Sequence, residues 1–185
     1  MIEQDLQLQI NSLNDRLEKS EQQPQLQDHQ HNGIDSTKVD INDLDLNAYS
    51  YIYNNTDTTI TVGTADTWYE IDSNFSNELI FGALFVGSHN IMVAQTGVYQ
   101  IIFSSSLQTG TADQVLGLTI AKGGIVLENP HENGTTVAVD KSINIAGCAI
   151  LNLTAKDEIS LAVKNYTLAT DILVEHANLS LFRIG

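Results

Sequence analysis

The stretch GVYQIIFSSSL, residues 97–107, decides the fold of this chain. Its side chains alternate at a spacing of two, and Tyr, Ile, Phe and Val suit a pleated, half-buried surface. One face carries Tyr99, Ile101, Phe103, Ser105 and Leu107, and the other carries Val98, Gln100, Ile102 and Ser104. Because one face of this long strand is strongly apolar, the rest of the chain is expected to supply a second sheet that covers it.

Short strands are expected on both sides of this stretch. They are predicted over 59–62, 67–71, 79–86 and 90–94 before it, and over 116–122, 125–128, 143–153, 159–163 and 177–184 after it. Gly123 and Gly124 predict a two-residue hairpin, and the segment 129–134 predicts a loop. Many short strands without helical periodicity predict a mainly β, antiparallel jelly-roll sandwich over residues 59–185.

The first twenty residues follow a different pattern. Apolar side chains recur with 4-3-4 spacing at Leu6, Ile10, Leu13 and Leu17, and polar residues fill the intervening positions. This narrow stripe predicts an amphipathic helix over 1–20 that self-associates as a short coiled coil. The alternative is a single helix docked on the chain's own head or on a partner. Ile at position a with Leu at position d favours dimers in parallel coiled coils.

Residues 21–58 are polar and are predicted to form an extended linker or attachment segment. His29 and His31 lie within it, at a spacing that points both side chains the same way on an extended chain. One pair supplies two ligands, but three copies on a three-fold axis would supply six imidazoles, enough for an octahedral transition metal such as iron, or for zinc. The alternative is that both histidines are solvent-exposed linker residues.

The composition narrows the possible partners. The chain has 185 residues, with 8 Lys and Arg against 23 Asp and Glu, for a net charge of −15. Because the basic residues are scattered, neither nucleic-acid binding nor binding to an anionic membrane is expected. No apolar run reaches membrane-spanning length, and no signal peptide is visible at the N-terminus. The single cysteine, Cys148, lies in an apolar strand and is expected to be a buried structural thiol.

The order of the strand motifs resembles the trimeric jelly-roll heads of the tumour necrosis factor and complement globular-head superfamily. The similar segments are GVYQIIFSSS at 97–106, the Gly-Gly hairpin at 122–125, LNLTAKDEISLAVKN at 151–165 and the closing strand at 177–184. In the turn at 155–157, Ala-Lys-Asp replaces the family's Gly-Asp. The resemblance covers roughly residues 59–185 and implies a head that assembles as a homotrimer.

The segment HQHNGIDSTKV, residues 29–39, resembles a motif of tailed-bacteriophage structural proteins, among them tail-tip, fibre and head-fibre proteins. The resemblance implies a short coiled coil, a metal-binding pair at His29 and His31, and a β-rich tip. It also implies a virion protein that is assembled in the bacterial cytoplasm and contacts capsid or tail proteins through residues 1–58. Only one His-x-His pair is present, whereas fibre shafts may carry several.

These observations favour a homotrimeric fibre or decoration protein whose head contacts a host-surface glycan or protein. Loops on a rigid sandwich carry recognition, so the candidate contact residues are Ser88, His89 and Asn90 in one loop and Pro130, His131, Glu132 and Asn133 in another. The alternative is a non-viral bacterial trimeric module of ligand or lectin type. An enzyme is not expected, because the five histidines form no recognisable catalytic arrangement.

Overall fold

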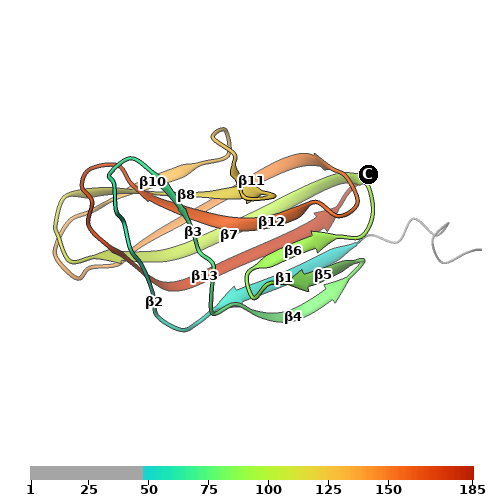
Figure 1. The fold of residues 1–185 in the computed structure, drawn as a ribbon, viewed down its shortest axis with the longest axis horizontal. Coiled ribbons are helices and arrows are strands. Elements are labelled where there is room, and N and C mark those ends of the chain that lie inside the picture. The colour runs from blue at the N-terminus through green and yellow to red at the C-terminus, as the bar shows by residue number, and fades with distance from the viewer. Residues whose placement is uncertain (1–47) are drawn as a thin grey trace, which may run out of the picture. The chain divides into compact units, whose positions relative to one another are not determined.

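The computed structural model describes residues 48–185, which form two antiparallel sheets packed face to face. Sheet A has the order β11-β7-β13-β1-β4, and β2 also pairs with β13; its strands are β1 (Tyr49–Asn54), β2 (Thr58–Ile60), β4 (Ser76–Phe81), β7 (Gly97–Thr109), β11 (Ile143–Leu153) and β13 (Ile172–Arg183). Sheet B has the order β10-β8-β12-β6-β5, with β3 on β12 and β9 on β8; its strands are β3 (Trp68–Glu70), β5 (Ala83–Val86), β6 (Asn90–Val93), β8 (Gln114–Lys122), β9 (Ile125–Val126), β10 (Glu132–Thr136) and β12 (Glu158–Asn165). Figure 1 shows the long strands of both sheets running in similar directions. The predicted jelly-roll sandwich is confirmed.

Strand β7 occupies the position that its sequence predicted. It pairs with β11 on one side and with β13 on the other. The residues expected to point inward are all buried, and they are Tyr99, Ile101, Phe103, Ser105 and Leu107. They pack against side chains of sheet B in a single core that both sheets share. The alternation at residues 97–107 therefore defines both the strand and the side of sheet A that faces the core.

Two turns follow from glycine conformations. Gly123 and Gly124 have φ values of +55° and +76°, the pattern of a two-residue primed hairpin turn, and Lys122 pairs with Ile125 across it. Gly82 has a φ of +66° and divides the strand predicted over 79–86 into β4 and β5. These two strands pair in different sheets, so the bend at Gly82 carries the chain from sheet A to sheet B.

The boundary predicted between linker and head lies too late in the chain. Residues 49–54, assigned to the linker over 21–58, form β1 and pair with both β13 and β4. Their inward side chains are Ser50, Ile52 and Asn54. Because two of these three are polar, the strand lacks the alternation of apolar and polar residues that marks a half-buried strand.

The expectation of a buried Cys148 is wrong, because the residue is exposed. Strand β11 alternates, and its inward positions belong to Ile143, Ile145 and the residues in phase with them. Cys148 lies out of phase with that set and therefore points away from the core.

Among residues 48–185 there is no helix long and apolar enough to cross a membrane.

Candidate functional site

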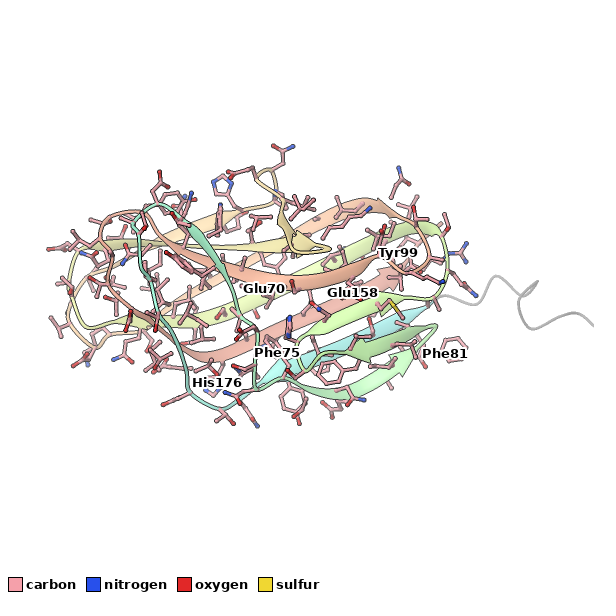
Figure 2. The ribbon with its side chains drawn as sticks, in the orientation of Figure 1. Glu70, Phe75, Phe81, Tyr99, Glu158 and His176 are labelled. Atoms are coloured by element: carbon pink, nitrogen blue, oxygen red, sulfur yellow. The ribbon has the colours of Figure 1, made fainter. Side chains whose placement is uncertain are left out.

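The outward side of sheet A, here called the outer face of sheet A, is apolar over much of its area. Each strand alternates between core and exterior, so every second residue lies on this face. Several large apolar side chains there are substantially exposed: Ile150 at 65%, Leu79 at 53%, Ile102 at 45%, Phe182 at 43% and Phe81 at 40%. Figure 2 shows Phe81 at the end of β4, projecting away from the sandwich. Exposed apolar groups gathered on one sheet face mark an interaction surface.

The strand register shows that these side chains are neighbours. One row across the sheet consists of Ile150, Gln100, Phe182, Tyr49 and Phe81, and the next consists of Cys148, Ile102, Ser180, Tyr51 and Leu79. The rings of Tyr49 and Phe81 stack with their centroids 5.5 Å apart. The two rows form one patch across five strands that is mostly apolar and aromatic, with Gln100 and Ser180 as its polar members. The patch lies at the end of the sheet where β1 begins.

The other end of the outer face of sheet A is polar. It contains a hollow of about 260 Å³ whose lining is mostly polar, with hydroxyl, amide and imidazole groups beside two apolar residues: Ser104, Ser105, Ser106, Asn144, Ile145, Ala146, His176 and Asn178. The Tyr51 hydroxyl donates to Asn178 Oδ1 at 2.8 Å, which joins the polar end to the aromatic patch. Hydrogen bonds from Ser142 and Ser106 lower the pKa of the Glu175 carboxyl, which therefore stays ionised near neutral pH. A partner could therefore form specific hydrogen bonds at the polar end and bury apolar surface at the other end.

The outward side of sheet B differs, because the chain covers it itself. Five residues that point away from the core on β8 and β12 are nevertheless buried: Thr119, Ala121, Ser160, Ala162 and Lys164. Strand β9 pairs with β8 within the sheet, and the residues after β9 lie over the outward side of β8, where the Thr119 hydroxyl donates to the Leu127 carbonyl at 2.7 Å. Strand β3 pairs with β12, and the side chains of Trp68 and Glu70 from β3 and of Tyr166 after β12 contact Lys164 and Ser160 on the outward side. The central strands of sheet B are therefore shielded on both faces.

The most polar part of this covering is centred on Lys164. Its Nζ lies 2.8 Å from Asp66 Oδ1, 4.0 Å from the ring centre of Tyr166 and 4.7 Å from that of Trp68. Burial lowers the pKa of Lys164, but Asp66 and Tyr166 raise it more, so the net shift is upward and the ammonium group stays charged. Beneath the rings lies Gly117, where a Cβ atom would come within 2.7 Å of Tyr166. The cation is thus held inside the protein's own aromatic cage.

The first predicted recognition loop lies against β3. The Ser88 hydroxyl donates to the Asp72 carbonyl at 3.4 Å, and His89 Nε2 lies 3.6 Å from Glu70 Oε1. Asn90 begins β6, and its amide donates to Glu158 Oε2 at 3.1 Å. Glu70 and Glu158 are both labelled in Figure 2. The loop is therefore held by contacts with neighbouring strands.

The second predicted loop is partly a strand. Pro130 lies in a turn and His131 just after it, with the His131 ring 6.3 Å from that of Trp68. The prediction that Glu132 and Asn133 lie in a loop is wrong, because both residues belong to β10, which pairs with β8. The Asn-Gly signal at 133–134 predicted a turn, but pairing along the edge of sheet B overrides it. Since β3 contacts His131 through Trp68 and His89 through Glu70, the structure brings the two predicted loops to the two ends of one short strand.

Several predicted site residues lie outside the described residues. These are the self-association positions Leu6, Ile10, Leu13 and Leu17 and the metal-site candidates His29 and His31. Within residues 48–185, no three His, Cys, Asp or Glu side chains gather closely enough to hold a metal ion.

The outer face of sheet A was missed from the sequence, although a signal for it exists. Positions 102, 150 and 182 carry Ile, Ile and Phe out of phase with the core residues of β7, β11 and β13. A half-buried strand normally places polar residues at those positions. Large apolar residues on both sides of three neighbouring strands are therefore the sequence signal for this exposed apolar face.

Comparison with known proteins agrees with the fold. No family model matches the chain, and no curated protein matches its sequence. Among solved structures, Eiger TNF from S. frugiperda matches with a TM-score of 0.54 and 17% identity, over 75% of this chain and 93% of that one. The globular domain of zebrafish complement 1qA protein matches with a TM-score of 0.51 and 14% identity, over 75% of this chain and 98% of that one. The described residues therefore have the jelly-roll fold of tumour necrosis factor and complement globular heads.

Proposed function

We propose that this chain is a homotrimeric virion structural protein of a tailed bacteriophage, of fibre or decoration type. Residues 1–47 would attach it to capsid or tail proteins, and the jelly-roll head would face outward and contact a host-surface glycan or protein. The observation that carries self-association is the apolar outer face of sheet A, where Ile150 is 65% exposed and Ile102 is 45% exposed in a single chain.

The energetics favour covering this face. Each square ångström of apolar surface removed from water contributes about 25 cal/mol, so burying several Ile, Leu and Phe side chains offsets a substantial part of the cost of association. A ring of three copies uses two different patches on each copy, one meeting the other around the axis. The number three comes from the resemblance to trimeric heads, which the jelly-roll fold supports.

The virion assignment rests on the segment at residues 29–39 and on the heptad spacing before it. In a trimer, His29 and His31 from three copies would place six imidazoles on the axis, a suitable set for iron, or for zinc. Such a site would fix the register of the three chains close to the point of attachment. A non-viral bacterial trimeric module would share the head and its self-association, and would differ in having no particle to bind.

Self-association is tested by native mass spectrometry of the full-length chain and of two matched variants. Ile102→Asp places a charge in the apolar patch and is expected to weaken the trimer about a hundredfold, because the carboxylate would be buried without a partner. Ile125→Asp makes the same change at a side chain that is 73% exposed on the hairpin of sheet B, and should leave the trimer intact. A monomeric wild type, or equal effects of the two variants, would refute this interface.

The virion role needs separate experiments. Antibody against the head should label particles purified from the phage or lysogen that carries the gene, and the same protein lacking residues 1–47 should fail to bind those particles. Treatment of the trimer with a strong chelator should release metal from the full-length protein and not from a His29→Ala/His31→Ala variant. Protein found only free of particles would favour the non-viral binding module.

A further inference from the structure

A second hollow lies on the head, between β2 and β3 and away from the apolar patch. Its volume is about 350 Å³, and its lining residues are of hydroxyl, aliphatic, aromatic and carboxylate type: Thr59, Ile60, Thr61, Tyr69, Glu70 and Asp72. We propose that it is a binding site for a neutral hexose unit of a surface glycan. The proposal deepens the host-contact role proposed above and does not require the head to be trimeric.

The walls of this pocket are held in place before any ligand binds. The Tyr69 hydroxyl accepts a hydrogen bond from the Thr64 backbone N–H at 2.8 Å, which fixes the ring. Glu70 Oε1 accepts a hydrogen bond from the buried Ser160 hydroxyl and lies 3.6 Å from His89 Nε2. A preorganised site avoids the entropic cost of ordering its side chains on binding.

The predicted recognition loop at 88–90 contacts two residues that line this pocket. Besides the contact of His89 with Glu70, the Ser88 hydroxyl donates to the Asp72 carbonyl, and the Ser88 carbonyl accepts from the Phe75 N–H at 3.3 Å. These bonds hold the chain segment that carries Asp72 against the body of sheet B. The loop therefore acts as a brace for the pocket wall.

The chemistry of the lining selects the ligand class. Carboxylates accept hydrogen bonds from hydroxyl groups, and threonine hydroxyls both donate and accept, so together they suit a ring with several hydroxyls. The Tyr69 ring and Ile60 supply apolar contact for the C–H face of a pyranose. A pocket of this size lies near the lower end of the range for small-molecule sites and fits one or two sugar units. Two carboxylates in a chain of net charge −15 disfavour sialic acids, uronic acids and phosphates.

The test uses saturation-transfer NMR on the full-length protein with glucose, galactose and mannose as probes and N-acetylneuraminic acid as the anionic counter-probe. At least one neutral hexose is expected to receive saturation from the protein, with a dissociation constant of the order of 1 mM, as is usual for a single small polar ligand. N-acetylneuraminic acid is expected to receive none.

Three variants connect the signal to the pocket. Glu70→Gln removes the charge but keeps an acceptor for the Ser160 hydroxyl. Asp72→Asn removes the charge of an exposed side chain. Each should weaken hexose binding at least fivefold. Asp140→Asn removes one exposed carboxylate from the turn between β10 and β11, the strands at one end of each sheet, and should leave binding unchanged.

Two results would overturn the proposal. One is the absence of saturation transfer to all three hexoses, and the other is a signal that Glu70→Gln and Asp72→Asn leave at the wild-type level. Native mass spectra of the same samples report the oligomeric state independently. A trimer that binds no hexose would therefore refute the pocket alone, and a monomer that binds hexose would refute the assembly alone.

Discussion

The outward faces of the two sheets differ in how far their side chains are exposed to solvent. On sheet B, residues such as Thr119 and Ala162 point away from the core and are still buried, because side chains of β3 and the segment after β9 lie over this face. On sheet A, Ile102 and Phe182 occupy equivalent outward positions and are 45% and 43% exposed. Small or hydrogen-bonded side chains lie beneath the internal cover, and large apolar ones lie where no described part of the chain covers them. The difference singles out the outer face of sheet A as the surface on which the proposed self-association depends.

The largest effect is expected where the covering of sheet B is opened. Lys164→Ala removes the cation between Trp68 and Tyr166 and leaves a void, at an expected cost of about 2–4 kcal/mol in the free energy of unfolding. Urea denaturation measures it, in the monomeric Ile102→Asp background so that association does not contribute. Gln100→Ala on the outward side of β7 should change stability by less than about 0.5 kcal/mol. Equal losses at the two positions would contradict the contrast between the faces.

A smaller loss in the free energy of unfolding is expected when a methyl group is added at Gly117, beneath the Trp68 and Tyr166 rings. At Gly117 a Cβ atom would lie 2.7 Å from Tyr166 Cε2 and 3.0 Å from Trp68 Cη2. Gly117→Ala should therefore cost about 1–3 kcal/mol through overpacking, measured in the same background. Gly110→Ala is the matched control, because no heavy atom lies within 4 Å of the added carbon. A stable Gly117→Ala protein would show that the covering is loosely packed.

The bare face of sheet A can be observed directly through its cysteine. Cys148 pairs with Ile102 across β11 and β7 and is the single thiol in the chain. In the assembled protein a maleimide should react with Cys148 at least about tenfold more slowly than in the monomeric Ile102→Asp variant, a difference of about 1.4 kcal/mol in accessibility. Urea-unfolded samples of both proteins should react at the same rate. Equal rates in the folded proteins would place the self-association surface elsewhere.

The smallest effect concerns the turn that leads from β11 in sheet A to β12 in sheet B. A hydrogen bond from Lys122, whose Nζ lies 2.6 Å from Asp157 Oδ2, lowers the pKa of the Asp157 carboxyl, and the Thr154 N–H adds to this. Because the folded pKa lies below the unfolded value of 3.8, the stabilisation is complete above that value and is lost as the pH falls through the folded pKa.

Asp157→Asn should therefore lower stability slightly at pH 7 and have less effect near pH 3, measured by urea denaturation at both values. Glu158→Gln, one residue later, is the comparison, since its carboxylate contacts Asn90. A loss for Asp157→Asn that is the same at both pH values would show that the carboxylate charge is not what stabilises the turn.

The elements predicted well are those whose local and tertiary preferences agree. Strand β7 has one fully apolar face, and the hairpin at Gly123 and Gly124 needs the positive φ angles that glycine adopts freely. Strands β1 and β10 were missed because pairing with neighbours decides them: β1 turns Ser50 and Asn54 inward, and β10 contains an Asn-Gly pair. The sequence of each strand by itself does not show which strands it pairs with.

The candidate site likewise has features that the sequence predicts and features that depend on tertiary contacts. The loop at 88–90 was identified from its position between strands, but its role behind Glu70 and Asp72 depends on contacts across 16 or more residues. The pocket lining comes from β2, β3 and residues that directly follow them, and these two strands belong to different sheets, so spacing along the chain does not show that they are neighbours. The apolar outer face could have been read from Ile102, Ile150 and Phe182, because their phase on the strands is visible in the sequence.

The place of β13 within sheet A has a consequence for synthesis in the cell. This strand comes last of all the strands in chain order, yet it lies between β7 and β1 and joins the β11–β7 pair to the β1–β4 pair. Until the ribosome has released residues 172–183, the two halves of the sheet cannot meet, and the rows of side chains that form the apolar patch do not exist. A chain whose synthesis has not yet reached β13 therefore cannot form the apolar patch, which exists only once sheet A is complete.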